Sequence, residues 1–206
     1  MNVRTFDRLK RGVDLTAAAV GLVVTSPIQL IIAGLVRVKL GSPVLFRQER
    51  PGKDTKIFTL VKFRTMAELD HSKGLVTDAE RLTRLGRLLR ATSLDELPTL
   101  WNVLRGDMSL VGPRPLRTYY LPRYSSEQAR RHGVRPGITG LAQVSGRNSL
   151  PWEQRFRLDV HYVDQRSLAL DVKILLSTVR RVVSRAGVSA DGHATMTPFL
   201  GAQGND

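Results

Sequence analysis

Cysteine is absent from this chain of 206 residues. Its absence excludes disulfide bonds, thiolate nucleophiles and zinc sites built from thiolates. Aromatic residues make up only 6% of the chain, and no helix-turn-helix or RNA-binding signature is found, so nucleic acid is not an expected partner. The histidines are scattered, without the spacing of a metal motif, and a histidine-based metal site is not expected either. They are His71, His132, His161 and His193.

Acidic residues are fewer than basic residues in this chain. The chain has 18 Asp and Glu against 32 Lys and Arg, a formal net charge of +14. Such a surplus predicts an anionic partner, which could be nucleic acid, a phosphorylated small molecule or the cytoplasmic face of a membrane. The length suits one domain with a short appendage, and a hydrophobic fraction of 42% allows a real core.

An uncharged run from Leu15 to Val36 is long enough to cross a bilayer as a helix. Lysines and arginines flank it on both sides, and both flanks are expected on the cytoplasmic side. At its centre, Pro27 removes a helical N–H and frees a carbonyl, to which Ser26 could donate a hydrogen bond. A signal peptide, a buried soluble helix and a kinked spanning helix are alternatives. We predict a re-entrant membrane hairpin over residues 1–37, broken at Ser26 and Pro27.

We predict that the remaining residues, 38–206, form a second domain. Residues 41–66 read as a β-hairpin, with β-prone segments at Val44–Phe46 and Ile57–Val61 and turn residues at Pro51–Asp54. The fold class is therefore α+β and mainly helical, with a membrane helix-break-helix, a small β-hairpin and amphipathic interfacial helices. The expected helices cover residues 79–90 (capped by Thr77 or Asp78), 98–105, 125–132 and 168–185.

The last of these helices is amphipathic and basic. It could pack on the domain or lie on an anionic membrane surface. Its apolar residues are expected to face one side: Leu168, Val172, Leu175, Leu176, Val179, Val182 and Val183. Its basic residues lie elsewhere: Lys173, Arg180, Arg181 and Arg185.

The stretch Ser93–Pro98 contains an adjacent acid pair, Asp95 and Glu96. One interpretation is a capping box, in which Ser93 caps a helix and Glu96 reaches back to it. Pro98 would then be the fifth helical residue, where its ring clashes with the carbonyl of Leu94. A helix that starts at Pro98 avoids the clash. Either start places both acids at the positive end of a helix dipole.

An ionised carboxylate in such a place could act as a nucleophile at phosphorus. Asp95 and Glu96, with Asp107 or Asp159, could also hold Mg²⁺, which takes one or two protein carboxylates together with substrate phosphates. A carboxylate that attacks a diphosphate needs a positive charge nearby, because two anions repel each other.

Several cations could bind the phosphates. Arg90 is the nearest to the acids of four arginines spaced along one predicted helix, and Arg114 is held between two prolines. Arg147 lies between Gly146 and Asn148, where backbone amides are also available. Lys62 and Arg64 near the end of the hairpin are further candidates. Each of these cations could instead be an ordinary surface charge.

Taken together, the motifs resemble those of small monotopic phosphoglycosyl transferases, in the bacterial sugar transferase family. The resemblance runs nearly from end to end. The motifs are Ser26-Pro27, Phe46–Gly52, Lys62–Met66, Ser93–Pro98, Gly106–Pro115, Val134–Gly140, Gly146–Asn148 and Asp159–Val163.

The resemblance implies a re-entrant membrane helix and a catalytic domain, residues 38–206, on the cytoplasmic face of the inner membrane. It implies that Asp95 attacks the β-phosphate of a UDP-sugar, that UMP leaves, and that polyprenol (undecaprenyl) phosphate accepts the phosphosugar. Glu96 completes the dyad, in proton handling or in placing Mg²⁺ beside Asp95. By the same resemblance, Lys62 and Asp159 occupy positions needed for activity, and Arg90, Arg114 and Arg147 bind phosphate and nucleotide.

The short chain and its tail, Gly187–Thr195, resemble the enzymes that transfer diacetylbacillosamine phosphate in N-linked protein glycosylation. The same reaction with UDP-galactose, UDP-glucose or UDP-GlcNAc is an alternative. So are a basic membrane- or nucleic-acid-binding module without catalysis, and a phosphatase that hydrolyses a phospho-aspartate. Membrane lipids are an expected partner. A homodimer is compatible with the sequence, which does not determine the oligomeric state.

Overall fold

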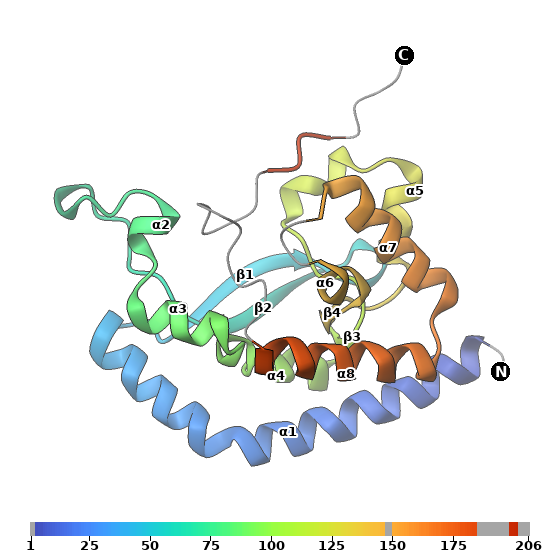
Figure 1. Cartoon of the computed structure of the whole chain (residues 1–206), viewed down its shortest axis with the longest axis horizontal. Helices are drawn as coiled ribbons and strands as arrows, with labels where there is room; N and C mark the ends of the chain where they lie inside the picture. The colour runs from blue at the N-terminus through green and yellow to red at the C-terminus, as the bar shows by residue number, and fades with distance from the viewer. Residues whose placement is uncertain (1–2, 147–149, 185–197, 202–206) are drawn as a thin grey trace.

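The computed structural model describes residues 3–146, 150–184 and 198–201 (Figure 1). Most of this part is helical, and two small sheets lie between the helices. The predicted class, mainly helical α+β with a small hairpin, is therefore confirmed. The α-helices are α1 (Val3–Leu40), α2 (Asp78–Arg81), α3 (Arg84–Ala91), α4 (Thr99–Arg105), α5 (Ser126–Ala129), α6 (Leu141–Ser145), α7 (Trp152–Gln165) and α8 (Leu168–Ser184).

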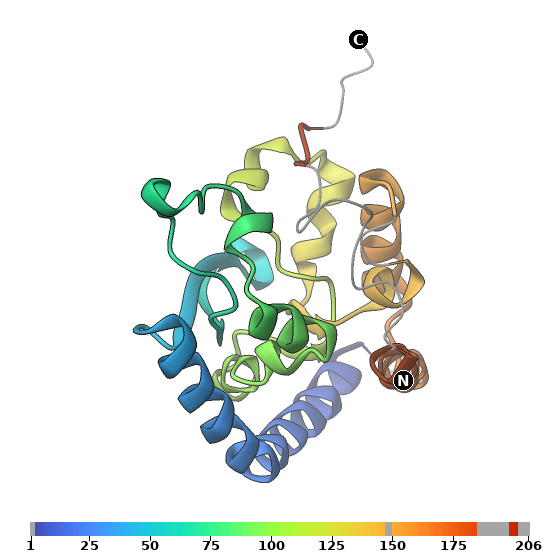
Figure 2. The ribbon, with the colours of Figure 1, turned by 60° about the vertical axis from the view of Figure 1, so that its left-hand side comes forward.

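The longest element, α1, begins well before the apolar run and continues through Pro27. Its backbone is one continuous helix that bends along its length (Figure 2), so the predicted break is a bend. Pro27 leaves the carbonyl of Val23 without its helical donor. The Ser26 hydroxyl donates to that carbonyl at 2.7 Å, which is the compensation expected from the sequence. Passage of α1 into and out of one membrane face stays a prediction.

One face of α1 packs on the rest of the chain through buried Phe6, Ala18, Ile32 and Val36. The opposite face is apolar and exposed, and the helix is long and apolar enough to span a membrane. Val23 and Leu30 are each 74% exposed. Contiguous apolar surface of this extent marks an interaction site, and it is consistent with membrane association.

The N-terminal half of α1 is also fastened by polar contacts. Asp14, which is buried, accepts a hydrogen bond from the backbone N–H of Leu110 at 3.0 Å. Lys10 pairs with Asp171 of α8 at 2.6 Å. Arg11 donates to the carbonyls of Val103 and Leu104 in the last turn of α4, where a cation is favoured. The basic flank predicted for the membrane thus partly serves to hold α1 on the domain.

The predicted hairpin is confirmed. Strands β1 (Leu45–Pro51) and β2 (Ile57–Phe63) pair antiparallel from Leu45 opposite Phe63 to Pro51 opposite Ile57. A second sheet joins β3 (Ser109–Val111) and β4 (Gly137–Thr139) in parallel. At Gly137 an added Cβ would lie 2.1 Å from the backbone nitrogen of Gly112. Only glycine permits this approach, which brings the Gly112–Pro115 turn against β4.

The single helix expected over residues 79–90 is instead two. Thr77 caps α2 and forms a capping box with Glu80. The helix then stops, because Thr83 adopts an extended conformation and caps α3. Gly86 lies so close to the hairpin that a Cβ there would meet the carbonyl oxygen of Thr65 at 1.9 Å. Tertiary contact with the hairpin therefore sets where α3 begins. In the helix predicted over 125–132, the first part is α5 and the rest is a 3-10 helix, Arg130–Gly133.

Val172, Leu176 and Val179 of α8 share one apolar face, as predicted, and the helix also has a second apolar face that packs inward. Ile174 is buried against Val111 and Tyr162. Val172, Leu176 and Val179 point outward and are 54%, 67% and 62% exposed. The helix therefore has both an inner and an outer apolar face. It lies on the same side of the molecule as α1 (Figure 1), which fits an interfacial position.

An aromatic cluster fastens the C-terminal end of the described chain. Phe199 is buried among Tyr120, Tyr124, Trp152 and Phe156. Its carbonyl accepts a hydrogen bond from Arg123 at 2.6 Å. The cluster ties this segment to the 3-10 helix Thr118–Arg123 and to the start of α7. The tail motif Gly187–Thr195 lies outside the described residues.

Candidate active site

The acid pair lies in a tight connection between α3 and α4. Ser93 has a φ of 57° and ends α3 in the left-handed conformation, where glycine is usual. One turn of 3-10 helix, Leu94–Glu96, follows, and α4 begins at Thr99 with Pro98 as its cap. The Ser93 side chain makes no capping hydrogen bond. The capping-box interpretation is therefore wrong, and a helix starting at Pro98 is correct to within one residue.

Glu96 is held between two cations that come from distant segments. The ammonium of Lys62, on β2, forms an ion pair with Oε1 of Glu96. Nη2 of Arg114 donates to the same oxygen at 2.9 Å. The side chains of Glu96 and Lys62 are only 17% and 16% exposed, so their charge-assisted hydrogen bond is largely shielded from water, whereas the Arg114 side chain is 44% exposed. We call this contact the Glu96 clamp.

The clamp gives the two adjacent acids different protonation behaviour. Although burial opposes it, the cations Lys62 and Arg114 lower the pKa of Glu96 to about 2. Burial and the neighbouring charge of Glu96 raise the pKa of Asp95 to about 6, against the opposing effect of Lys62, Arg90 and Arg114. Asp95 is 8% exposed and makes no ion pair within the described part of the chain. It is thus a mostly ionised carboxylate at neutral pH, and its basicity exceeds that of an ordinary Asp.

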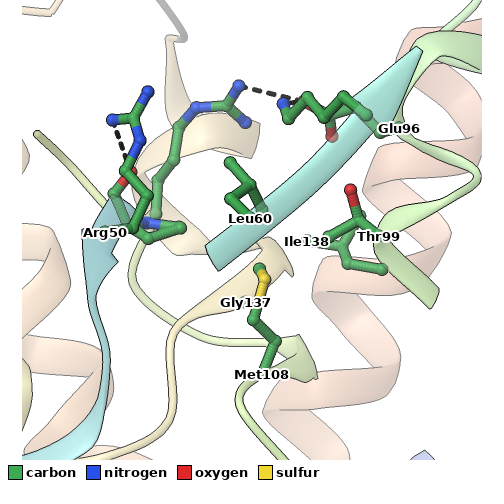
Figure 3. Close-up of a pocket in the computed structure, with 10 residues that line it drawn as sticks. Arg50, Leu60, Glu96, Thr99, Met108, Gly137 and Ile138 are labelled. Carbon is green, nitrogen blue, oxygen red and sulfur yellow. Dashed lines mark hydrogen bonds and ion pairs between the residues drawn. The ribbon is translucent and has the colours of Figure 1, made fainter. Parts of the chain in front are cut away.

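A cavity of about 290 Å³, including its open mouth, lies beside the acid pair. Figure 3 shows Glu96 at one end and Arg50 at the other, with Leu60 between them. The floor is apolar and the rim is basic. Asp95 adjoins this cavity through Glu96 and is not one of its lining residues. Those are Arg50, Leu60, Lys62, Glu96, Thr99, Met108, Arg114, Pro115, Gly137 and Ile138.

Arg90 joins the site from α3. Its Nε donates to the hydroxyl of Thr65 at 3.1 Å. Burial lowers the pKa of Arg90, while the negative charge of Asp95 acts against that effect. Arg90 therefore lies close enough to Asp95 for the two charges to interact, as predicted for the arginine nearest the acids.

Arg64 was predicted to bind phosphate but lies elsewhere. It is buried, and it donates to the carbonyls of Leu40, the last residue of α1, and of Ser42. It also pairs with Glu68 at 3.1 Å. Along a strand, successive side chains point to opposite faces, but Arg64 lies just past the end of β2, and it turns to cap the C-terminus of α1.

Asp159 also lies inside the domain. Its carboxylate pairs with Arg131 at 2.7 Å, and the two side chains are 2% and 1% exposed. Arg131 in turn donates to the backbone carbonyl of Arg114 at 2.7 Å. Asp159 therefore reaches the site through two residues, by holding Arg131, which holds the backbone of Arg114. A sequence signal for this role was not found, because nothing in the chain order connects residues 131 and 159.

The other predicted ligands do not gather around the acids. Asp107 accepts a hydrogen bond from Asn102 at 3.1 Å and pairs loosely with Arg105. No group of three or more His, Asp or Glu capable of holding a metal occurs within the described residues. Arg147 lies outside the described residues. A metal ion here would have Asp95 as its protein ligand and would take most of its other ligands from a bound phosphate group.

Comparison with known proteins identifies the family of this chain. The family described as "Bacterial sugar transferase" matches residues 5–185. A protein of Bacillus subtilis named an uncharacterized sugar transferase, EpsL, is 56% identical over 195 residues, which cover 94% of this chain and 96% of that protein.

The names of two further relatives state a sugar donor and an acceptor. A UDP-glucose:undecaprenyl-phosphate glucose-1-phosphate transferase of Caulobacter vibrioides is 42% identical, over 84% of this chain and 69% of its own length. A UDP-N-acetylgalactosamine-undecaprenyl-phosphate N-acetylgalactosaminephosphotransferase of Aeromonas hydrophila is 38% identical, over 87% of this chain. The chain spans only 44% of that protein, and 43% of the galactosyl transferase CpsE of Streptococcus agalactiae.

The position of Asp159 generates a prediction about stability. Asp159→Asn leaves the buried Arg131 without its counter-charge, so the free energy of unfolding should fall by roughly 3–5 kcal/mol. Asp164→Asn is the matched control, because Asp164 pairs with Arg130 at the surface, where both side chains are more than 40% exposed. That variant should lose less than about 1 kcal/mol. Denaturant unfolding in detergent measures both, and equal stability of the two variants would contradict a structural role for Asp159.

Proposed function

The chain belongs to the bacterial sugar transferase family, and we propose that it transfers a phosphosugar from a UDP-sugar to undecaprenyl phosphate through Asp95. Its relatives are named undecaprenyl-phosphate sugar phosphotransferases, which supports a phosphoglycosyl transferase. The observation that carries the proposal is the Glu96 clamp. It engages one acid fully with cations and leaves its neighbour, Asp95, as an ionised carboxylate without an ion pair in the described residues.

In the first step, a carboxylate oxygen of Asp95 attacks the β-phosphorus of the UDP-sugar. A P–O bond forms to Asp95, and the bond from the β-phosphorus to the bridging oxygen breaks. The electron pair leaves with UMP, and the phosphosugar stays on Asp95 as an acyl phosphate. The Asp95 carboxylate and the diphosphate are both anions and repel each other. Lys62, Arg90 and Arg114 offset this repulsion, because the positive charge of each stabilises negative charge near Asp95.

In the second step, a phosphate oxygen of the polyprenol phosphate attacks the same phosphorus. The bond to Asp95 breaks, Asp95 returns as a carboxylate, and polyprenol-diphosphate-sugar is the product. The exposed apolar faces of α1 and α8 support delivery of the lipid, because they allow the domain to sit at the membrane surface where the lipid phosphate lies. Glu96 holds Lys62 and Arg114 in position through both steps.

Among the described residues of the site, one carboxylate, that of Asp95, is available to bind Mg²⁺. Asp95 is the carboxylate of the site that is not engaged by a cation among the described residues, and Mg²⁺ commonly binds through one or two carboxylates and substrate phosphates. When bound, the ion would supply positive charge to the diphosphate. Asp95 would hold it, and Glu96 would contribute by keeping the nearby cations in place.

For the sugar, we propose an N-acetylated amino sugar such as UDP-diacetylbacillosamine. The support is the resemblance of the motif Gly187–Thr195 to that of the enzymes that transfer diacetylbacillosamine phosphate. The names of its relatives refer to glucose, galactose and N-acetylgalactosamine instead, so these UDP-sugars are the competing donors. Incubation with a panel of UDP-sugars followed by intact-mass measurement distinguishes them, because each sugar leaves a different added mass.

We further propose that the domain faces the cytoplasm and that α1 enters and leaves the inner membrane on that same side. The chain lacks cysteine, so Asn2→Cys and Ser42→Cys each create a single thiol. Both should resist a membrane-impermeant maleimide in intact spheroplasts and react after permeabilisation. Labelling of residue 2 but not of residue 42 in intact spheroplasts would show instead that α1 crosses the membrane.

The nucleophile assignment predicts the behaviour of Asp95→Asn. An amide cannot form the acyl phosphate, so UMP release should fall by at least about 10³-fold, the scale expected for loss of a catalytic nucleophile. Intact-mass analysis should show a phosphosugar adduct on the wild type and none on the variant. Asp164→Asn is the control, because it removes a carboxylate at the surface, away from the acid pair. UMP release by Asp95→Asn at the wild-type rate would rule out this role, and release of free sugar phosphate without lipid would indicate a phosphatase.

The raised pKa of Asp95 predicts a pH dependence. Attack requires the carboxylate, so the rate should be highest above the pKa of about 6 and should fall about tenfold per pH unit below it. The burst of UMP in the absence of lipid should be followed, because the acceptor phosphate itself titrates near pH 6. A burst rate that is constant between pH 5 and pH 8 would contradict the assignment.

A further inference from the structure

Arg50 stands at the end of the cavity opposite Glu96 (Figure 3). It belongs to β1, where its backbone lies opposite Phe58. Its guanidinium donates to the carbonyl of Pro115 at 3.1 Å and to the side chain of Gln48. Its Nε is buried and has no hydrogen-bond partner within the described residues. Buried donors are nearly always satisfied, so an unsatisfied one at a cavity wall points to a missing partner.

The charge of Arg50 is also uncompensated. The buried arginines Arg64 and Arg131 have carboxylate partners, Glu68 and Asp159. Arg50 pairs with no carboxylate in the part of the chain that the structure describes. Burial and the nearby cations Arg114 and Arg117 lower its pKa to about 10. A half-buried cation beside other cations is costly unless an anion joins it.

The position of Arg50 indicates which anion that is. Arg114 lies between the two ends of the site, because it pairs with Glu96 and also acts electrostatically on Arg50. The β-phosphate must approach Asp95, so the other phosphate of the diphosphate, one bridging oxygen away, extends along Arg114 toward Arg50.

The surroundings of Arg50 favour the nucleotide over the lipid phosphate. Near Arg50 lie Arg117 and the half-exposed Tyr119 of the 3-10 helix Thr118–Arg123. The floor residues Leu60 and Met108 belong to the core cluster that contains Ala18 of α1. The membrane-facing helix is thus beneath the floor, whereas the charged and aromatic neighbours of Arg50 belong to the segment that follows Pro115.

We propose that Arg50 binds the α-phosphate of the UDP-sugar and stabilises the negative charge that develops on UMP as it leaves. This inference rests on the proposed function. As the bond from the β-phosphorus to the bridging oxygen breaks, its electron pair moves onto the α-phosphate of UMP, which gains a full negative charge. The unsatisfied Nε and the uncompensated guanidinium of Arg50 are placed to receive that charge. Once UMP has departed, Arg50 has no part in the attack by the lipid.

The two half-reactions therefore separate this role from others. The variants are Arg50→Gln and Arg50→Lys, with Arg47→Gln as the matched control, because Arg47 is an exposed arginine on the same strand. The first half-reaction is followed as the UMP burst and the mass of the adduct, without lipid. Its reversal is followed by adding UMP to the purified adduct. The second half-reaction is followed by adding a short polyprenol phosphate to the same purified adduct.

For Arg50→Gln we expect the UMP burst and the UMP-driven reversal to slow by about 100-fold, as for loss of one transition-state donor. Arg50→Lys should recover part of this loss, since it restores the charge but not the planar donors. The rate at which lipid consumes the adduct should be unchanged, as should all rates of Arg47→Gln.

Three results would overturn the inference. Slowing of lipid attack with a normal UMP burst would assign Arg50 to the acceptor phosphate. Equal slowing of both half-reactions, together with a lower unfolding temperature in Gln and Lys variants alike, would mean that Arg50 only packs the cavity wall. A normal UMP burst and reversal in Arg50→Gln would also reject it. Absence of any adduct on the wild type is a different result, because it removes the proposed function itself.

Discussion

The Glu96 clamp is the interaction on which the site depends. Lys62 from β2 and Arg114 from the turn after β3 converge on one carboxylate oxygen. Without Glu96, two cations would face each other in a largely buried cavity. Glu96 pairs with both cations and holds them close to Asp95, which itself makes no ion pair with either of them. The two adjacent acids can then have very different pKa values, about 2 for Glu96 and about 6 for Asp95. Glu96 has direct cation partners, whereas Asp95 is affected mainly by burial and by the negative charge of Glu96.

Behind the clamp, a second charge pair holds its frame. Arg131 and Asp159 are almost completely buried, and Arg131 binds the carbonyl of Arg114. The close approach of Gly112 and Gly137 sets the path of the same turn against β4. The guanidinium of Arg114 thus emerges from a turn that is fixed on both sides, so less conformational entropy is lost when it binds a phosphate. Residues distant from the cavity can affect the reaction in this way without contacting substrate.

The membrane-facing part of the molecule is joined to the site by the core. Ala18 of α1 belongs to the same cluster as Leu60 and Met108 of the cavity floor. On its other side α1 exposes an apolar surface, and α8 exposes a second one. A domain anchored in this manner keeps its cavity near the membrane surface, where a lipid phosphate is found. The proposed use of a lipid acceptor would account for a long apolar helix packed beneath the cavity floor.

Much of the site was accessible from the sequence, since its acids and cations stand in local motifs with fixed turn chemistry. The acids Asp95 and Glu96 are not part of a helix cap, and Ser26 bonds the carbonyl freed by Pro27, both as predicted. The structure also brings the predicted cations Lys62, Arg90 and Arg114 close to the acids, while their part in binding phosphate stays a prediction. Arg64 and Asp159 carry the right charge in the right motifs but face the C-terminus of α1 and the domain interior. Local pattern does not reveal which way a side chain turns at the end of a strand.

By itself, the sequence determined the hairpin, the amphipathic and apolar helices, and the identity of the acid pair, because these follow from residue periodicity, proline geometry and charge. Only the tertiary structure decided the partners. It split the helix at Thr83, because Gly86 packs on Thr65, and it divided the apolar residues of α8 between two faces. It also brought Arg50, Arg114 and Glu96 to one cavity and Arg131 to Asp159. Pairings between residues far apart in the chain depend on how the elements pack, and no local preference encodes them.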